Sequence, residues 1–126
     1  MLKGSCLCGA IKFKAEGAAR DPAACHCTQC RKQSGHYWAA VQVMDDELHI
    51  AGTPRWYAAS KTAKRGFCPT CGSFLFWKGN GDPDTGISLG ALDGPTGLRL
   101  ERHIFTDDKG DYYDITDNVP QEEQET

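Results

Sequence analysis

Short runs of apolar and aromatic residues alternate along the chain with glycine, proline and aspartate. Residues 10–14, AIKFK, alternate apolar and charged side chains, as a strand with one buried face does. Residues 37–43, YWAAVQV, are rich in the aromatic and β-branched side chains that favour strands. Further candidate strands lie at residues 47–50, 55–58, 73–77, 87–92 and 98–105. The pattern therefore predicts an all-β domain.

Helical periodicity is weak, because no run of ten or more residues repeats apolar side chains at a spacing of three and four. The single helical candidate covers residues 28–34, where Thr28 can cap the first turn and Gly35 can end the last. We therefore expect antiparallel sheets with at most short helical turns.

The composition is that of one globular domain, with 126 residues, 40% hydrophobic and 25% charged. We assign residues 1–120 to this domain and residues 121–126, QEEQET, to an acidic, disordered tail. The charge is uneven, since residues 1–105 carry 13 basic and 9 acidic side chains, whereas residues 106–126 carry eight acidic side chains and one lysine. Residues 1–105 are thus only weakly basic. Such a surface can attract small anions, but it argues against a nucleic-acid partner.

The expected compartment decides how the cysteines are interpreted. No stretch approaches the roughly 20 apolar residues of a membrane helix, and the first residues, MLKGSCLCGA, lack the apolar segment of a secretion signal. We therefore expect a cytoplasmic protein with no membrane partner. In a reducing cytoplasm, seven cysteines point to metal or thiol chemistry instead of disulfides.

The cysteines fall into three groups with the spacing of metal ligands. The segment from Cys68 to Cys71, CPTC followed by glycine, has the form of a zinc knuckle, in which two thiolates hold one ion on a tight turn. Cys6 and Cys8 lie two apart, so on a strand they project from the same face and can share an ion. A closed structural site would combine these two pairs and leave a three-ligand site with an open fourth position, formed by Cys25, Cys27 and Cys30.

A second division of the cysteines fits the spacing as well. The pairs Cys27-x-x-Cys30 and Cys68-x-x-Cys71 would together form a zinc ribbon. The remaining thiols would then be spare or regulatory, namely Cys6, Cys8 and Cys25. Spacing alone leaves both divisions open.

Five segments of the chain together resemble the glutathione-dependent formaldehyde-activating enzyme family, which also includes centromere protein V: GSCLCGAIKF, CHCTQCRKQSG, RGFCPTCGSFLFW, ISLGALD and RHIF. The resemblance implies a β-tent fold, Zn²⁺ as cofactor at two sites per chain, and the division of the cysteines into four plus three. It also implies a reaction in which the thiol of glutathione adds to formaldehyde and gives S-hydroxymethylglutathione.

The chemistry of a three-cysteine zinc site agrees with that reaction. Three thiolates and one Zn²⁺ carry a net negative charge, which favours delivery of a thiolate sulfur over polarisation of a carbonyl. We therefore predict a zinc-dependent carbon–sulfur lyase-like enzyme that acts on glutathione or a related thiol adduct. The alternative is a non-catalytic zinc module that carries glutathione, senses redox state or binds a macromolecular partner.

Candidate residues for the substrate lie beside the cysteines. Glutathione carries two carboxylates, for which nearby cations are the natural ligands, and the chain offers Arg31, Lys32, Lys64 and Arg65. His36 follows the second cysteine group and is the candidate for proton transfer near neutral pH. His26 lies between two cysteines, and in an extended segment its side chain points away from theirs.

Overall fold

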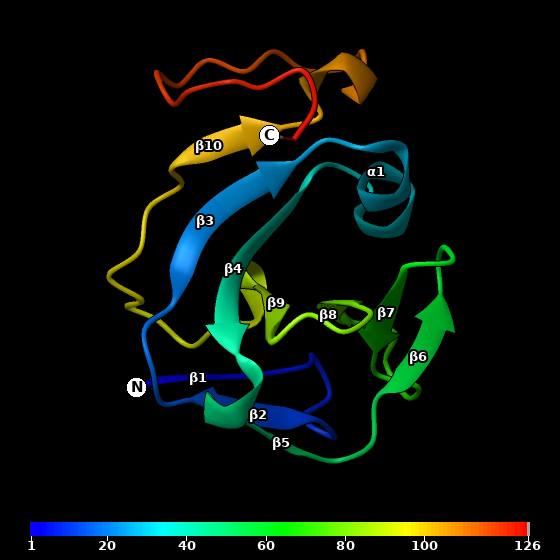
Figure 1. The fold of residues 1–126 in the computed structure, drawn as a ribbon, viewed down its shortest axis with the longest axis vertical. Helices are drawn as coiled ribbons and strands as arrows, with labels where there is room; N and C mark the ends of the chain where they lie inside the picture. The colour runs from blue at the N-terminus through cyan, green and yellow to red at the C-terminus, as the bar shows by residue number, and fades with distance from the viewer. Residues whose placement is uncertain (126) are drawn as a thin grey trace.

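The computed structural model describes residues 1–125, and within them it contains two β-sheets, one α-helix and three 3₁₀ turns (Figure 1). The smaller sheet is antiparallel and has the order β1-β2-β5. Its strands are β1 (Leu2–Ser5), β2 (Lys12–Ala15) and β5 (Leu48–Ala51). It lies at the bottom of Figure 1, below the curved strands of the larger sheet.

The larger sheet has seven strands in the order β10-β3-β4-β9-β8-β7-β6. In chain order these are β3 (Arg20–Cys25), β4 (Trp38–Met44), β6 (Arg55–Ala58), β7 (Ala63–Phe67), β8 (Phe74–Gly79), β9 (Asp84–Ser88) and β10 (Arg102–Ile104). All neighbours are antiparallel except β10, which runs parallel to β3. The predicted all-β class is confirmed, and the parallel pair of β10 with β3 is the one departure from antiparallel pairing among the named strands of the described residues.

The core forms where the two sheets face each other. Exposed lysines alternate along β2 with buried Phe13 and Ala15, as the sequence pattern predicts. The Phe13 ring meets Phe76 of β8 edge-on, with ring centroids 5.4 Å apart. Gly4 of β1 also forms an isolated antiparallel bridge to Leu92, in the segment between β9 and β10. A Cβ on Gly4 would come within 2.5 Å of a backbone oxygen, so only glycine permits this approach.

The helix, α1 (Thr28–Ser34), coincides with the predicted helical turns. Its N-cap differs from the prediction, because the sulfur of Cys27, and not the Thr28 hydroxyl, accepts from the Cys30 backbone N–H at 3.4 Å. Gly35 ends the helix in the left-handed conformation, with φ 83°, as expected. The helix therefore begins on a candidate metal ligand.

Three strands were not expected from the sequence, namely β1, β3 and β7. Strand β3 contains Pro22, a left-handed Asp21 with φ 56° and a register shift, all of which hide the alternation that marks a strand. Strand β7, AKRGF, does not show the usual alternation of buried apolar and exposed charged side chains, because its arginine, Arg65, is only 4% exposed. Charged residues normally face water, so a buried one misleads any pattern of hydrophobicity.

Two expected strands are shorter than predicted. Within residues 87–92 the strand stops at Ser88 and becomes the 3₁₀ turn η2 (Leu89–Ala91). Within residues 98–105 only β10 forms, and the turn η3 (Thr106–Asp108) follows it. The turn η1 (Asp45–Glu47) precedes β5, and the other expected strands agree to within a few residues.

The expected acidic tail makes contacts with the domain over its described part, residues 121–125. The backbone N–H of Glu122 donates to the carbonyl of His103 at 2.9 Å, and its carboxylate accepts from Arg102 at 2.9 Å. In Figure 1 the red C-terminal segment runs close to β10. Thr126, the last residue of the expected tail, lies outside the described residues.

Over residues 1–125, no helix has the length and apolar character needed to cross a membrane.

Candidate metal centres

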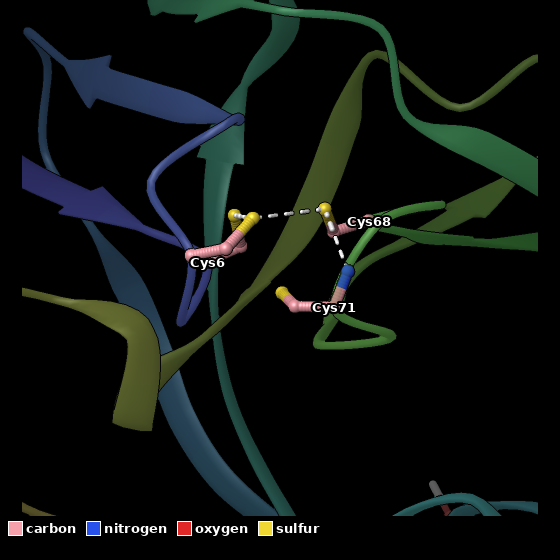
Figure 2. A group of neighbouring side chains, drawn as sticks. Cys6, Cys68 and Cys71 are labelled. Atoms are coloured by element: carbon pink, nitrogen blue, oxygen red, sulfur yellow. Dashed lines mark hydrogen bonds between the residues drawn. The ribbon is translucent and has the colours of Figure 1, made fainter.

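The first cysteine cluster joins two hairpin turns that lie far apart in the sequence. Cys6 and Cys8 occupy the turn between β1 and β2, and Cys68 and Cys71 occupy the turn between β7 and β8. The four sulfurs all lie within 4.8 Å of one another. Figure 2 shows the sulfurs of Cys6, Cys68 and Cys71 facing a shared space between the turns. The two turns can therefore be clasped by one ion.

The donor set fits a tetrahedral zinc ion. The sulfur of Cys8 lies 3.7 Å from that of Cys6 and 3.8 Å from that of Cys68. Four sulfurs at about 2.3 Å from zinc would be about 3.8 Å apart at the corners of a tetrahedron. A disulfide would instead bring two sulfurs to about 2.05 Å, and all seven cysteines are free.

Backbone and side-chain donors favour the thiolate form, which binds metal, at three sulfurs of this cluster, namely those of Cys6, Cys68 and Cys71. The N–H of Ile11 donates to the Cys6 sulfur at 3.3 Å, and the N–H of Cys71 donates to the Cys68 sulfur at 3.4 Å. The hydroxyl of Ser73, helped by the Ser73 backbone, lowers the pKa of Cys71 to about 5. Gly72 takes the left-handed conformation that the knuckle turn requires, with φ 80°.

The second cluster is built on the start of the helix. Cys25 ends β3, Cys27 caps α1 and Cys30 lies in its first turn, and their sulfurs lie within 4.8 Å of one another. The Cys30 N–H donates to the Cys27 sulfur at 3.4 Å, which repeats the turn of Cys68 and Cys71. Hydrogen bonds from the Cys25 and Cys30 side chains lower the pKa of the Cys27 thiol. Three sulfurs can hold an ion and leave its fourth position open.

The structure decides between the two divisions of the cysteines. The pairs Cys27–Cys30 and Cys68–Cys71 belong to separate clusters, so they do not form a zinc ribbon. Cys6, Cys8 and Cys25, which that division leaves as spare thiols, each belong to a cluster. The geometry is the four-plus-three arrangement, and each cluster could hold one metal ion.

A cavity of about 270 Å³ opens onto the three-cysteine cluster. The indole rings of Trp38 and Trp77 form apolar walls, and the carboxylates of Asp21 and Glu125 lie among its polar lining residues. Cys30 packs with Trp38 and Ala40 in a small buried cluster of its own. A ligand in this cavity would therefore reach the open side of the second metal position.

Of the four cations expected to bind substrate, only Arg65 lines this cavity. Lys64 and Arg65 are neighbours on β7 and so face opposite sides of the sheet. The Lys64 ammonium lies 4.5 Å over the ring of Trp56, away from the cysteines. Lys32 is exposed beside a separate hollow with Tyr57, and the Nε of Arg31 is buried with no partner among the described residues.

His36 does not reach the cavity that a proton-transfer group would need to face. His36 is exposed, and the centroid of its ring lies 4.6 Å from that of the Tyr37 ring and 4.2 Å from that of the Tyr113 ring. It is not among the residues that line the cavity beside the three-cysteine cluster. The prediction of a catalytic His36 therefore finds no support in the geometry.

A chain of four titratable side chains, which sequence reasoning missed, runs behind the three-cysteine cluster. His26, which is 1% exposed, contacts the Tyr113 hydroxyl through Nδ1 and lies 2.9 Å from His103 Nδ1 through Nε2. The Nε2 of His103 lies 3.0 Å from Asp117. The expectation that His26 points away from the cysteines agrees with this arrangement. Only the fold brings these residues together, so no local motif could have revealed them.

The direction of the hydrogen bonds along this row of side chains follows from Asp117, the carboxylate at one end of it. An ionised carboxylate only accepts, so His103 donates from Nε2, and a neutral His103 ring then accepts at Nδ1. His26 then donates from Nε2 and accepts the Tyr113 proton at Nδ1. Burial and the neighbouring His103 lower the pKa of His26 to about 4, in agreement with a neutral ring. The chain thus fixes the residue between Cys25 and Cys27 in one orientation.

We expect Tyr113→Phe to lower the free energy of unfolding by about 1–3 kcal/mol, because it leaves a buried acceptor on His26 without a partner. The matched control is Tyr112→Phe, since Tyr112 is 57% exposed and its hydroxyl donates to the exposed Gly35 carbonyl at 3.3 Å. Denaturant unfolding at equal zinc concentration measures both. Equal small losses would show that the Tyr113 hydroxyl does not hold His26.

The comparisons with known proteins agree with this geometry. The family model of the glutathione-dependent formaldehyde-activating enzyme matches residues 1–108. A Schizosaccharomyces pombe protein named as an uncharacterized lyase is 30% identical over 119 residues, which cover 93% of this chain and 87% of that protein. A crystal structure of a Rhodobacter sphaeroides protein is similar with a TM-score of 0.63 and 26% identity, over 75% of this chain and 91% of the other. The chain belongs to the glutathione-dependent formaldehyde-activating enzyme family.

Proposed function

We propose that the protein is a zinc-dependent carbon–sulfur lyase whose three-cysteine site joins glutathione, or a related thiol, to formaldehyde. The observation that carries the proposal is the convergence of Cys25, Cys27 and Cys30 within 4.8 Å at the wall of a cavity of about 270 Å³. Three ligands leave a position for a substrate sulfur, whereas the four-cysteine cluster is a closed structural site. The second zinc ion would be held by that closed cluster.

The residues of the chain would divide the work as follows. Cys25, Cys27 and Cys30 would hold the catalytic ion, and Trp38 and Trp77, which line the cavity, would exclude water from it. When bound, zinc supplies Lewis acidity and stabilises a thiolate at neutral pH. The protein thereby brings the thiol sulfur and the aldehyde carbon together in a confined space.

The acidic side of the cavity suits a ligand that carries an ammonium group. Asp21, Glu122 and Glu125 share the single guanidinium of Arg102, at distances of 2.7, 2.9 and 3.3 Å. Three carboxylates and one guanidinium leave net negative charge, and two of these carboxylates line the cavity. The α-ammonium of the γ-glutamyl residue of glutathione has the complementary charge.

The reaction needs no oxidant or reductant. The sulfur electron pair forms a new bond to the formaldehyde carbon, and the π pair of the carbonyl moves onto its oxygen. The proton that leaves the thiol ends on that oxygen, so the product is the hydroxymethyl thioether. In the reverse direction the same carbon–sulfur bond breaks, which is a lyase reaction.

The zinc content per chain, measured with and without excess glutathione on reduced protein, tests the metal half of this proposal. We expect two zinc ions per chain. Glutathione binding should require only the labile ion, which is the one held by the three-cysteine cluster. Product formation is then compared with the uncatalysed rate, because thiols add to formaldehyde unaided. One zinc ion and indifference to glutathione would overturn the proposal. Two zinc ions with thiol binding and no acceleration would instead favour a glutathione carrier.

A further inference from the structure

Arg65 is a buried cation with an unusual set of partners. It lies on β7, is 4% exposed and rests against the ring of Phe74, with 5.4 Å between the guanidinium carbon and the ring centre. Nε donates to Gln29 and Nη1 donates to Gln33, both at 3.1 Å. Nη1 and Nη2 also donate to the sulfur of Cys30, at 3.5 and 3.6 Å. All three nitrogens are therefore engaged with α1.

The partner that can balance this charge is the Cys30 sulfur, which becomes a thiolate when it binds metal. A buried guanidinium is costly unless an opposite charge lies beside it. Over residues 1–125, the ion pairs include none between Arg65 and a carboxylate, and the two glutamine side chains are neutral acceptors. Cys30 alone among its partners can carry negative charge. Gln29 and Gln33 stand one turn apart on α1 and aim the guanidinium at the sulfur between them.

We propose that Arg65 is the counter-cation of the Cys30 thiolate and, as a positioning residue, holds the metal on the three-cysteine site. Three thiolates within 4.8 Å repel one another, and a fixed guanidinium beside one of them offsets that repulsion. Arg65 also cancels the net negative charge that three thiolates and one Zn²⁺ would otherwise leave. A bound Zn²⁺ would therefore lie in a site with no net charge, with Cys30 as its least electron-rich sulfur.

This role deepens the proposed function, because it rests on a metal ion at the three-cysteine site, and it replaces the expected role of Arg65 in binding a substrate carboxylate. It does not depend on the identity of the thiol. Metal retention and metal spectra, measured without any thiol, would therefore stand even if glutathione proved to be the wrong substrate.

The test compares Arg65→Met with Lys64→Met, which removes one cation from the same strand on its opposite face. Each protein is loaded with zinc, and the release of each ion to a chelator is timed. We expect the labile ion to leave Arg65→Met about 10–100-fold faster than the unsubstituted protein, as when an outer partner of a metal ligand is lost. The Lys64→Met protein should release it at the unsubstituted rate, and the second ion should be unaffected in both.

Cobalt loading adds a readout that a general loss of stability would not change. A thiolate that loses two hydrogen bonds becomes more electron-rich, so its charge-transfer band to Co²⁺ should move to longer wavelength in Arg65→Met. If Arg65→Met does not fold, the same measurements are made on Gln33→Glu. This change at an exposed helix position introduces a carboxylate that competes with the Cys30 sulfur for Nη1 of Arg65. Release at the unsubstituted rate with an unshifted band in the folded variant would overturn the proposal.

Discussion

Cys68→Ser should abolish cooperative folding, the largest single effect expected in this protein. Cys68 is 0% exposed, and its sulfur connects the β7–β8 turn to Cys8 in the β1–β2 turn, 60 residues away. A structural zinc ion contributes about 10–16 kcal/mol in small zinc domains, which matches or exceeds the about 5–15 kcal/mol that stabilises a typical domain. Loss of one ligand therefore removes most of the available stability.

Thermal unfolding followed by circular dichroism measures the effect of Cys68→Ser. Leu7→Ala is the matched control, because Leu7 lies between two ligands of the same cluster and is 90% exposed. It should unfold at the temperature of the unsubstituted protein. A sharp transition at that temperature for Cys68→Ser, with one zinc ion fewer, would show that the two turns hold together without the ion.

Cys30→Ser should remove the second zinc ion and reduce product formation to the uncatalysed rate while the domain stays folded. Cys30 belongs to a small buried cluster apart from the main core, and the four-cysteine cluster does not depend on it. Two remaining sulfurs hold zinc poorly, and the substrate sulfur then has no ion to meet. The midpoint of thermal unfolding should fall far less than in Cys68→Ser.

Zinc content, calorimetric titration with glutathione and rate measurements are made on the same preparation of Cys30→Ser. Thr28→Ala provides the control within the helix, since Thr28 is exposed and does not cap α1. It should keep both ions and the full rate. Equal loss of fold in Cys30→Ser and Cys68→Ser would refute the division into a structural and an open site.

The two sites also differ in what surrounds their sulfurs. Backbone amides and the Ser73 hydroxyl stabilise the four-cysteine cluster, all from the turns that carry its ligands. The three-cysteine cluster instead has a buried guanidinium on one side and a tryptophan-lined cavity that opens onto it. A closed set of local donors suits a permanent ion, whereas a charged partner beside an open cavity suits a site that exchanges ligands.

The sequence alone was sufficient for features set by neighbouring residues. The knuckle of Cys68 and Cys71 with Gly72, the short helix over residues 28–34 and the alternation along β2 all appear as predicted. Each depends on side chains within one turn or one strand, where spacing translates directly into geometry. The resemblance to the family also came from such local segments, and the family match over residues 1–108 confirms it.

The tertiary structure decided the features that depend on distant segments. Cys27–Cys30 and Cys68–Cys71 have the same spacing, so only the path of the chain assigns one pair to each cluster. The contact of His26 with Tyr113 spans 87 residues, and the contact of Arg65 with Cys30 spans 35. Burial turned Arg65 from an expected surface clamp into a partner of a metal ligand. Local pattern fixes which chemistry the residues can do, whereas the packing of strands determines which groups meet and which charges lose their water.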